Sequence, residues 1–321
     1  MLTRLRSDER GVPVMGISRQ SEAAYVAKRY LIDRKSKVEI AKEIRSSRFR
    51  VARLIDEAYN GGCVRISVDL PIGVDFEIST QLRERFGLQH AAVVHSGTRD
   101  AGEVRQALAP VAASFLTEVI REGDVLGITP GRTLRQLDKY VTELPYCDVV
   151  QLTGVANPNI ESGMGVVARL AAVSRGRAHF LYSPLTVSEA SVAEGIRRQP
   201  AIRRTLSRID DLDVAFVTIG SWDPPQSQLF DNMVDEDFRT RLLGEGIHGE
   251  VGATLIHEDG RLSEQLAPVA IAVTAAQLAQ ARNVIAVAGG TGKTTAIRAA
   301  LLSGMVNTLI TDAFTAQELL V

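Results

Sequence analysis

The sequence predicts an α/β protein with a small helical N-terminal unit and a large unit built on a mostly parallel, doubly wound, Rossmann-like sheet. Seven short, apolar, β-rich runs recur after residue 89, and helical stretches lie between most of them. Because the runs are apolar throughout, both faces of the sheet should be covered by helices. The runs are HAAVVH (90–95), DVLGIT (124–129), DVVQLTG (148–154), HFLYSP (179–184), DVAFVTIG (213–220), NVIAVAGG (283–290) and NTLITD (307–312).

The N-terminal unit is predicted from helical periodicity in three successive segments, AYVAKRYLID (24–33), KVEIAKEI (37–44) and SRFRVARLIDEAY (47–59). In the third segment apolar residues recur at positions i, i+3, i+4 and i+7, which places them on one helix face. Ser47 suits the N-cap of this helix. A helix, a short helix, a tight turn and a third helix form a helix-turn-helix, the arrangement of many DNA-binding proteins.

The outer face of the third predicted helix carries the residues expected to contact DNA. Phe49 and Arg53 point away from the apolar stripe, with Arg50 beside them and Arg48 at its edge. In a major groove, Arg50 and Arg53 would read guanine edges and Phe49 would touch a thymine methyl group. Arg48 and Ser47 would hold phosphates.

Charge supports a polyanionic partner for this unit. Residues 1–62 contain 14 basic and 8 acidic residues, whereas the remainder contains 23 and 30. Arg45 occupies the turn position that usually carries glycine, so the turn is either left-handed at a non-glycine residue or of another type. There Arg45 would add a phosphate contact. The alternative is a packing or dimerisation module with a solvated basic face.

Composition places the protein in a reducing, aqueous compartment. The chain has 321 residues and two cysteines, Cys63 and Cys147, which are too few for a disulfide framework. No apolar run has the length of a membrane span, and the first residues lack the apolar stretch of a signal peptide. A soluble cytoplasmic protein without a membrane partner is therefore expected.

The segment IAVAGGTGKTTAI (285–297) resembles a nucleotide-binding loop, but Val287 stands where the first glycine of that motif belongs. Gly289 and Gly290 would let a ligand approach the backbone, and the following helix N-terminus and Lys293 would attract an anion. We therefore predict a site for a small phosphate or carboxylate. The alternatives are a glycine-rich turn with a solvated lysine, or an NTPase with magnesium-dependent turnover.

The segment TPGRT (129–133) repeats this design after another predicted strand and before a predicted helix, TLRQLDKY (133–140). Thr129 and Thr133 offer hydroxyl groups, Gly131 an open backbone and Arg132 a cation. Arg132 would favour a second negative group on the ligand. Because the carboxyl ends of parallel strands share one edge of a sheet, the two loops predict one site for a ligand with phosphate and hydroxyl groups.

Two further segments offer partners for ligand hydroxyl groups. The loop GSWDPPQSQLF (220–230) contributes Asp223, Gln226 and Ser227, unless it is a surface loop made rigid by its prolines. Glu250 is flanked by glycines and would bind a sugar hydroxyl group if it is not solvated. The five histidines show no metal-ligand spacing, and no catalytic constellation is evident, so neither a metal nor a cofactor is expected.

Over nearly its whole length the chain resembles the SorC-type bacterial transcription regulators, also called the sugar-binding domain or deoxyribonucleoside-regulator-like family. The blocks that carry the resemblance are EIAKEIRSSRFRVARLIDEA (39–58), VRISVDLP (64–71), LRERFGLQHAAVV (82–94), GITPGRT (127–133), QLTGVAN (151–157), FLYSPL (180–185) and the most specific block, residues 285–320. Arg132 departs from the small residue usual in the family, and QLTGVAN lacks an arginine that some members have there.

The resemblance implies an effector domain related to sugar-phosphate isomerases, which binds a sugar or phosphosugar, and a tetramer bound to a double-stranded DNA operator. Thr129, Gly131 and Thr133 match the family's phosphate loop, Lys293 matches its anion-binding lysine, and Glu250 matches an acidic effector contact.

These expectations combine into a domain plan with a DNA-binding domain at 1–62, a linker at 63–75 and an effector and oligomerisation domain at 76–321. The expected protein is a homotetrameric, ligand-responsive regulator of sugar, polyol or nucleoside-sugar metabolism, and not an enzyme. The alternative is a sugar-phosphate isomerase-type enzyme with an N-terminal oligomerisation module.

Overall fold

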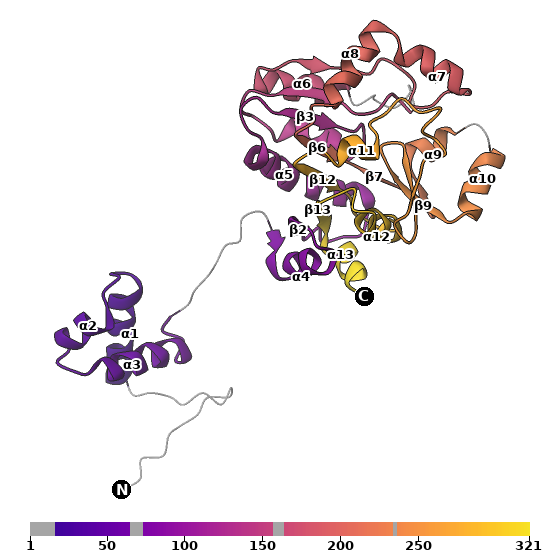
Figure 1. The fold of residues 1–321 in the computed structure, drawn as a ribbon. Helices are drawn as coiled ribbons and strands as arrows, with labels where there is room; N and C mark the ends of the chain where they lie inside the picture. The colour runs from indigo at the N-terminus through magenta and orange to yellow at the C-terminus, as the bar shows by residue number, and fades with distance from the viewer. Residues whose placement is uncertain (1–16, 65–72, 157–163, 234–235) are drawn as a thin grey trace. The chain divides into compact units, whose positions relative to one another are not determined.

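The computed structural model describes residues 17–64, 73–156, 164–233 and 236–321. The chain forms two compact units, Met1–Asp69 and Leu70–Val321, and each is described by itself (Figure 1). Most of the expected linker, residues 65–72, lies outside the described residues. The last two residues of that expected linker form β1 (Val74–Asp75), which pairs with the sheet of the large unit.

The N-terminal unit consists of α1 (Ile17–Leu31), α2 (Lys37–Glu43) and α3 (Arg48–Asn60). Ser36 and Glu39 form a capping box at the start of α2, and the Ser47 hydroxyl accepts the amide of Arg50 at 3.2 Å as the N-cap of α3. The apolar stripes of the helices meet in one small core. Its buried members are Ala23, Val26, Ala27, Ile40, Ala41, Val51, Leu54, Ile55 and Ala58.

The turn between α2 and α3 is left-handed at Arg45, where φ is +50°. The next residue closes the turn, because the amide of Ser46 donates to the carbonyl of Ala41 at 2.8 Å. Arg45 thus adopts the left-handed backbone conformation that glycine usually adopts in such a turn. In α1, Tyr30 and Leu31 are partly exposed, whereas Val26 is buried.

The large unit contains an eight-stranded sheet in the order β1-β2-β13-β12-β6-β3-β4-β5. Every pairing in it is parallel except that between β1 and β2. Six of the seven predicted runs contain a strand of this sheet, and the seventh, HFLYSP, overlaps β5 at His179, which confirms the predicted fold class. The strands are β2 (His90–Val94), β3 (Val125–Ile128), β4 (Asp148–Gln151), β5 (Ala178–His179), β6 (Val214–Val217), β12 (Asn283–Val287) and β13 (Thr308–Asp312).

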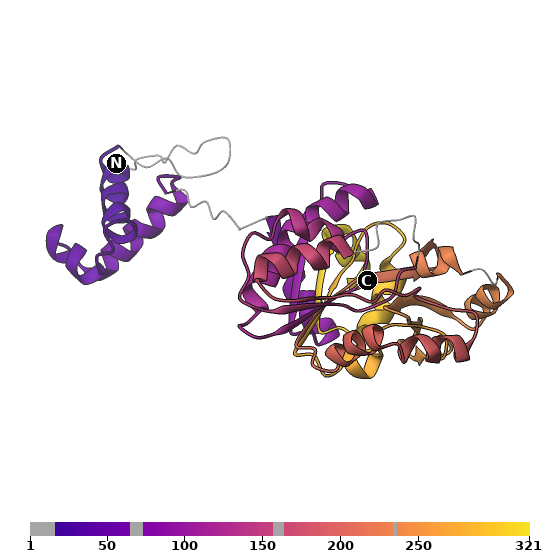
Figure 2. The same cartoon turned by 90° about the horizontal axis from the view of Figure 1, so that it is seen from above.

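Helices pack on both faces of this sheet and bury two separate apolar cores. One core takes side chains from α5 (Ala101–Val119), the 3₁₀ helix η2 (Leu134–Lys139) and α6 (Met164–Ser174). Figure 2 shows helices on both sides of the sheet. The opposite core takes side chains from six other helices. These are α4 (Phe76–Phe86), α7 (Ala190–Arg197), α8 (Pro200–Ile209), α11 (Ala275–Leu278), α12 (Thr294–Leu302) and α13 (Ala313–Leu320).

A second, five-stranded antiparallel sheet in the order β11-β10-β9-β7-β8 was not predicted. The chain leaves β6 and enters this sheet after one residue, Thr218, so the second sheet begins where the first one ends. Its strands are β7 (Ile219–Trp222), β8 (Pro225–Gln226), β9 (Ile247–Val251), β10 (Thr254–His257) and β11 (Leu262–Ser263). The other helices of the described residues are α9 (Gln228–Asn232) and α10 (Glu236–Gly244). Within the described ranges, no helix is both long and apolar enough to cross a membrane.

Candidate ligand-binding site

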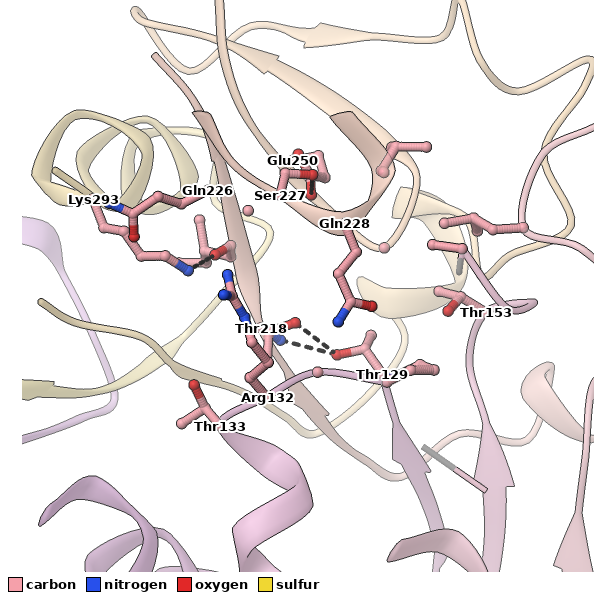
Figure 3. A pocket seen from close by; sticks show the side chains of 18 of the residues that line it. Thr129, Arg132, Thr133, Thr153, Thr218, Gln226, Ser227, Gln228, Glu250 and Lys293 are labelled. Carbon is pink, nitrogen blue, oxygen red and sulfur yellow. Dashed lines mark hydrogen bonds between the residues drawn. The ribbon is translucent and has the colours of Figure 1, made fainter. Parts of the chain in front are cut away.

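A pocket with an empty volume of about 770 Å³, its open mouth included, lies at the carboxyl ends of β12, β6, β3 and β4, four consecutive strands of the large sheet. The second sheet closes the pocket from the other side. In an open α/β sheet this edge is where ligands bind. Arg105 lines the pocket. The other polar and charged side chains in the lining are labelled in Figure 3: Thr129, Arg132, Thr133, Thr153, Thr218, Gln226, Ser227, Gln228, Glu250 and Lys293.

The turn after β3 is locked to the end of β6. The hydroxyl oxygen of Thr129 accepts the amide of Thr218 at 2.9 Å. A Cβ atom at Gly131 would lie 2.7 Å from Cγ2 of Thr218, so only glycine fits against that side chain. Thr133 makes no side-chain cap on the helix that follows, which leaves its hydroxyl group at the pocket. This helix, η2, is a six-residue 3₁₀ helix and not the α-helix predicted there.

The turn after β12 brings Gly289 and Lys293 to the pocket. Lys293 precedes α12, and its ammonium group donates to the carbonyl of Ile219 at 2.7 Å (Figure 3). Gly290 does not line the pocket, and its amide donates to the Asp312 carboxylate at 2.8 Å and to the Thr315 hydroxyl at 3.1 Å. The prediction that the ligand approaches the backbone of Gly290 is therefore wrong.

The loop between β7 and α9 contributes two of its three predicted residues to the pocket. Gln226 lines the pocket and donates its side-chain amide to the carbonyl of Thr291 at 2.7 Å, so it also fixes the turn after β12. Ser227 is buried beside it and caps α9 by accepting the amide of Phe230 at 3.1 Å. Asp223 is exposed and outside the pocket lining, which corrects its predicted placement.

Glu250 is 6% exposed, so the alternative of a solvated side chain is wrong. Its carboxylate accepts the hydroxyl of Ser227 at 2.6 Å and the indole N–H of Trp222. Burial raises the pKa of Glu250 to about 7, and these two hydrogen bonds counteract the rise. The backbone makes room for the carboxylate at Gly220, the residue opposite Glu250 in the β7–β9 pair.

Three cationic side chains line the pocket: Lys293, Arg132 and Arg105. Burial lowers the pKa of Lys293 to about 8, Glu250 opposes this, and the two arginines lower it further. Burial also lowers the pKa of Arg105, and Arg132 lowers it next, with Asp100 opposing. Sequence reasoning missed Arg105, because an arginine in the amphipathic pattern of α5 gives no sign that it faces a pocket.

The described part of the chain offers neither arginine of the pocket an acceptor. Over the described ranges, no hydrogen bond or ion pair joins the guanidinium of Arg105 or Arg132 to another group. Among the described residues that line the pocket, Glu250 is the one acidic residue. Positive charge therefore exceeds negative charge at the pocket, which favours an anionic ligand.

No group of three or more potential metal ligands is present in the part of the chain that the structure describes. Asp312, which could have held magnesium in a nucleotide site, instead caps α13 by accepting the amides of Phe314 and Thr315. Its other oxygen accepts the amide of Gly290. The aspartate is thus committed to holding the turn after β12 against α13.

The outer face of α3 exposes the six residues predicted to contact DNA, including Arg45 in the preceding turn and Ser47 at the N-cap. Phe49 is 74% exposed, and the guanidinium of Arg48 lies 5.0 Å from the centre of its ring. The other two arginines of this face, Arg50 and Arg53, are engaged within the unit. Arg50 binds Glu22 of α1 at 2.9 Å, and Arg53 lies 3.8 Å from Glu57.

The match of residues 71–321 to the sugar-binding domain family shows that the chain belongs to this family of proteins. The uncharacterized transcriptional regulator YjhU of Escherichia coli K12 is 29% identical over 315 residues, which cover 91% of this chain and 92% of the relative. The deoxyribonucleoside regulator of Bacillus subtilis is 26% identical over 310 residues, with 95% of this chain and 99% of the relative covered.

Within that family, the chain is similar in fold to SorC-type regulators. The full-length sorbitol operon regulator SorC from Klebsiella pneumoniae superposes with a TM-score of 0.69 at 23% identity. The superposition covers 95% of this chain and all of the SorC chain. The resemblance to SorC-type regulators and the predicted fold class are thereby confirmed.

Proposed function

We propose that this protein is a ligand-responsive transcriptional regulator. In this proposal the DNA-binding domain at 1–62 binds a double-stranded operator, residues 63–75 link it to the rest, and residues 76–321 bind a phosphorylated sugar or polyol and form the oligomer, a tetramer. It acts in the cytoplasm on genes of carbohydrate metabolism and is not an enzyme.

The pocket is the observation that carries the ligand half of this proposal. Two turns, one after β3 and one after β12, meet at the carboxyl edge of the sheet with three cations and with the hydroxyl group of Thr133. Lys293 and Arg132 extend toward the same part of the pocket (Figure 3). A phosphate would receive charge-assisted hydrogen bonds there. Gln228 and Thr153 line the same pocket with neutral polar groups that suit sugar hydroxyls.

The DNA half rests on the N-terminal helices and on the names of the relatives. The order of a helix-turn-helix is present in α2, the left-handed turn at Arg45 and α3. The exposed face of α3 carries the stack of Arg48 on Phe49. The similar proteins from E. coli and B. subtilis are named as regulators. A ligand can regulate such a protein only by binding differently to its DNA-competent and DNA-incompetent states.

DNA binding tests the proposal. Labelled duplex from upstream of the protein's own gene should bind with an affinity that falls steeply with salt, and a sugar phosphate should change that affinity. Binding to unrelated duplex of equal length is the control. If specific and unrelated duplexes bind equally, or if no sugar phosphate alters either the affinity or the melting temperature, the proposal is wrong.

One observation favours the alternative of an isomerase-type enzyme. A buried carboxylate with a pKa of about 7, such as Glu250, has the proton affinity that a general base requires. Both carboxylate oxygens are however engaged, one by Ser227 and one by Trp222. Interconversion of aldose and ketose phosphates that disappears in Glu250→Gln would establish the enzyme, and its absence across the sugar phosphates that bind would exclude it.

A further inference from the structure

We propose that the turn after β12, residues 288–293, passes the effect of a bound ligand from the pocket to α13 and α4, and that Asp312 is the positioning residue that joins the turn to α13. The inference rests on the proposed function, because it concerns the response to the ligand of the same pocket. Asp312 lies outside the pocket lining, so its role is to hold the turn and not to touch the ligand.

The turn lies between two cavities. Gly289 and Lys293 line the ligand pocket, whereas Gly290 and Thr291 line a second, smaller cavity with an empty volume of about 170 Å³, its open mouth included. The rest of the lining of this second cavity is Arg99, Asp312, Phe314, Thr315 and Glu318. The turn thus has space between itself and α13, and it can shift there without displacing packed side chains, as it could not in a close-packed interior.

The backbone of the turn contains the residues that such a shift requires. Gly290 has a φ of +92° and Gly292 a φ of +80°. In this left-handed region glycine moves without the steric cost that a Cβ atom imposes on other residues. Segments that absorb large backbone changes in ligand-driven transitions are short and often contain such residues. The turn therefore has the conformational freedom of a hinge.

Asp312 joins this turn to α13 through both oxygens of one buried carboxylate, which is 0% exposed. One oxygen accepts the amides of Phe314 and Thr315 at 3.1 and 3.0 Å and so caps α13. The other accepts the amide of Gly290 at 2.8 Å and the hydroxyl of Thr315 at 2.6 Å. Because hydrogen bonds to a buried charged group are costly to break, a shift of the turn should carry the start of α13 with it.

The next contact leads from α13 to α4. The two helices pack against each other (Figure 1) and contribute to the same apolar core. The guanidinium of Arg85 in α4 also donates to the carbonyl of Leu320 in α13. Among the described residues, α4 is the first α-helix of the large unit and follows β1 directly. A displacement of α13 is thereby passed to the helix nearest in sequence to the residues that join the two units.

Two variants separate the turn from α13 and leave the pocket lining unchanged. In Asp312→Asn the remaining carbonyl oxygen can still cap α13, but the amide group that replaces the other oxygen cannot accept the amide of Gly290. Thr315→Val removes the hydroxyl group that is the second acceptor of that amide and keeps the shape of the side chain. Neither residue lines the pocket, so both variants should bind the ligand as the wild type does.

The measurement is the affinity of the full chain for labelled duplex from upstream of its own gene, by fluorescence anisotropy, with and without a sugar phosphate. Glucose 6-phosphate, fructose 6-phosphate and ribose 5-phosphate are compared, and the one that changes the wild-type affinity most is used for the variants. The ratio of the two wild-type affinities should lie between about 5 and 150. In Asp312→Asn and Thr315→Val this ratio should fall close to one.

Ligand binding is measured separately by titration of the emission of Trp222, the chain's single tryptophan, whose indole N–H bonds Glu250. Both variants should give the ligand affinity of the wild type. Thr274, the N-cap of α11, lies outside both cavities and supplies a control for lost stability. Thr274→Ala should lower the melting temperature, because a helix cap is removed, and should keep the wild-type ratio of operator affinities.

The outcomes separate this inference from the proposed function. If Asp312→Asn and Thr315→Val keep the wild-type ratio, the inference is wrong and the proposed function stands. The inference is also wrong if Thr274→Ala loses the ratio to the same extent, or if the variants lose ligand binding itself. If one of the two variants does not fold, the other decides. If none of the three sugar phosphates changes the wild-type operator affinity, the inference and the ligand response of the proposed function are both overturned.

Discussion

Replacement of Gly220 by alanine should displace the buried carboxylate of Glu250. An alanine Cβ at this position would lie 1.8 Å from one oxygen of that carboxylate, 2.4 Å from its carbon and 2.7 Å from the other oxygen. The Glu250 side chain cannot rotate away from this Cβ and still keep the hydrogen bonds that both carboxylate oxygens make. The carboxylate would therefore leave Ser227 and Trp222, its two donors.

The magnitude follows from the two hydrogen bonds that are lost. A buried polar group left without its partner costs about 1–3 kcal/mol, so the loss of both hydrogen bonds should lower the free energy of unfolding by about 2–6 kcal/mol. In a unit of this size, 1 kcal/mol corresponds to about 2–4 °C, so the melting temperature should fall by about 4–24 °C. Thermal unfolding followed by Trp222 emission measures both the loss of stability and the changed surroundings of the indole.

A matched glycine provides the control. Gly195 lies within α7, where a Cβ would meet open space, and Gly195→Ala should leave the melting temperature unchanged or raise it slightly. If Gly220→Ala has the same melting temperature as Gly195→Ala and the same Trp222 emission as the wild type, the described position of Glu250 is wrong.

Three further predictions follow from the charges of the two units. Arg53→Ala should weaken operator binding and lower its salt dependence, both measured by fluorescence anisotropy. Lys28→Ala removes an exposed charge from α1 and is the control. If it weakens operator binding as much as Arg53→Ala does, the assignment of DNA contact to α3 is wrong. Lys293→Gln should abolish the thermal stabilisation by sugar phosphates, and an undiminished shift would show that the anion binds elsewhere. Sugar-phosphate affinity, from titrations of Trp222 emission, should fall as the pH rises through about 7 and 8, because Glu250 gains negative charge and Lys293 then loses its positive charge. Glu250→Gln should remove the fall in affinity near pH 7. An affinity that rises between pH 7 and 8 would contradict the roles given to Glu250 and Lys293.

The parallel sheet could be predicted from the sequence because its strands are buried on both faces and read as continuous apolar runs. The antiparallel sheet could not, because its central strands IGSW (219–222) and IHGEV (247–251) are short, rich in glycine and polar groups, and lack regular alternation. Both strands are largely buried for a reason that is visible only in three dimensions: they pack against α12 and around the carboxylate of Glu250.

The candidate site was predicted in part, since turns after parallel strands must meet at one edge of the sheet. That rule brought Thr129, Gly131, Arg132, Thr133 and Lys293 together. It could not decide which backbone amides were already bonded within the fold, which is why Gly290 was misassigned. It also could not identify Arg105, which reaches the pocket from a helix.

The most direct test of the account is a crystal structure of the protein with a bound sugar phosphate that raises its melting temperature. The account predicts the ligand in the pocket between the two sheets, with a phosphate in contact with Lys293 or with the turn formed by Gly131, Arg132 and Thr133. A ligand bound elsewhere, with these turns and Lys293 making no contact to it, would contradict the account.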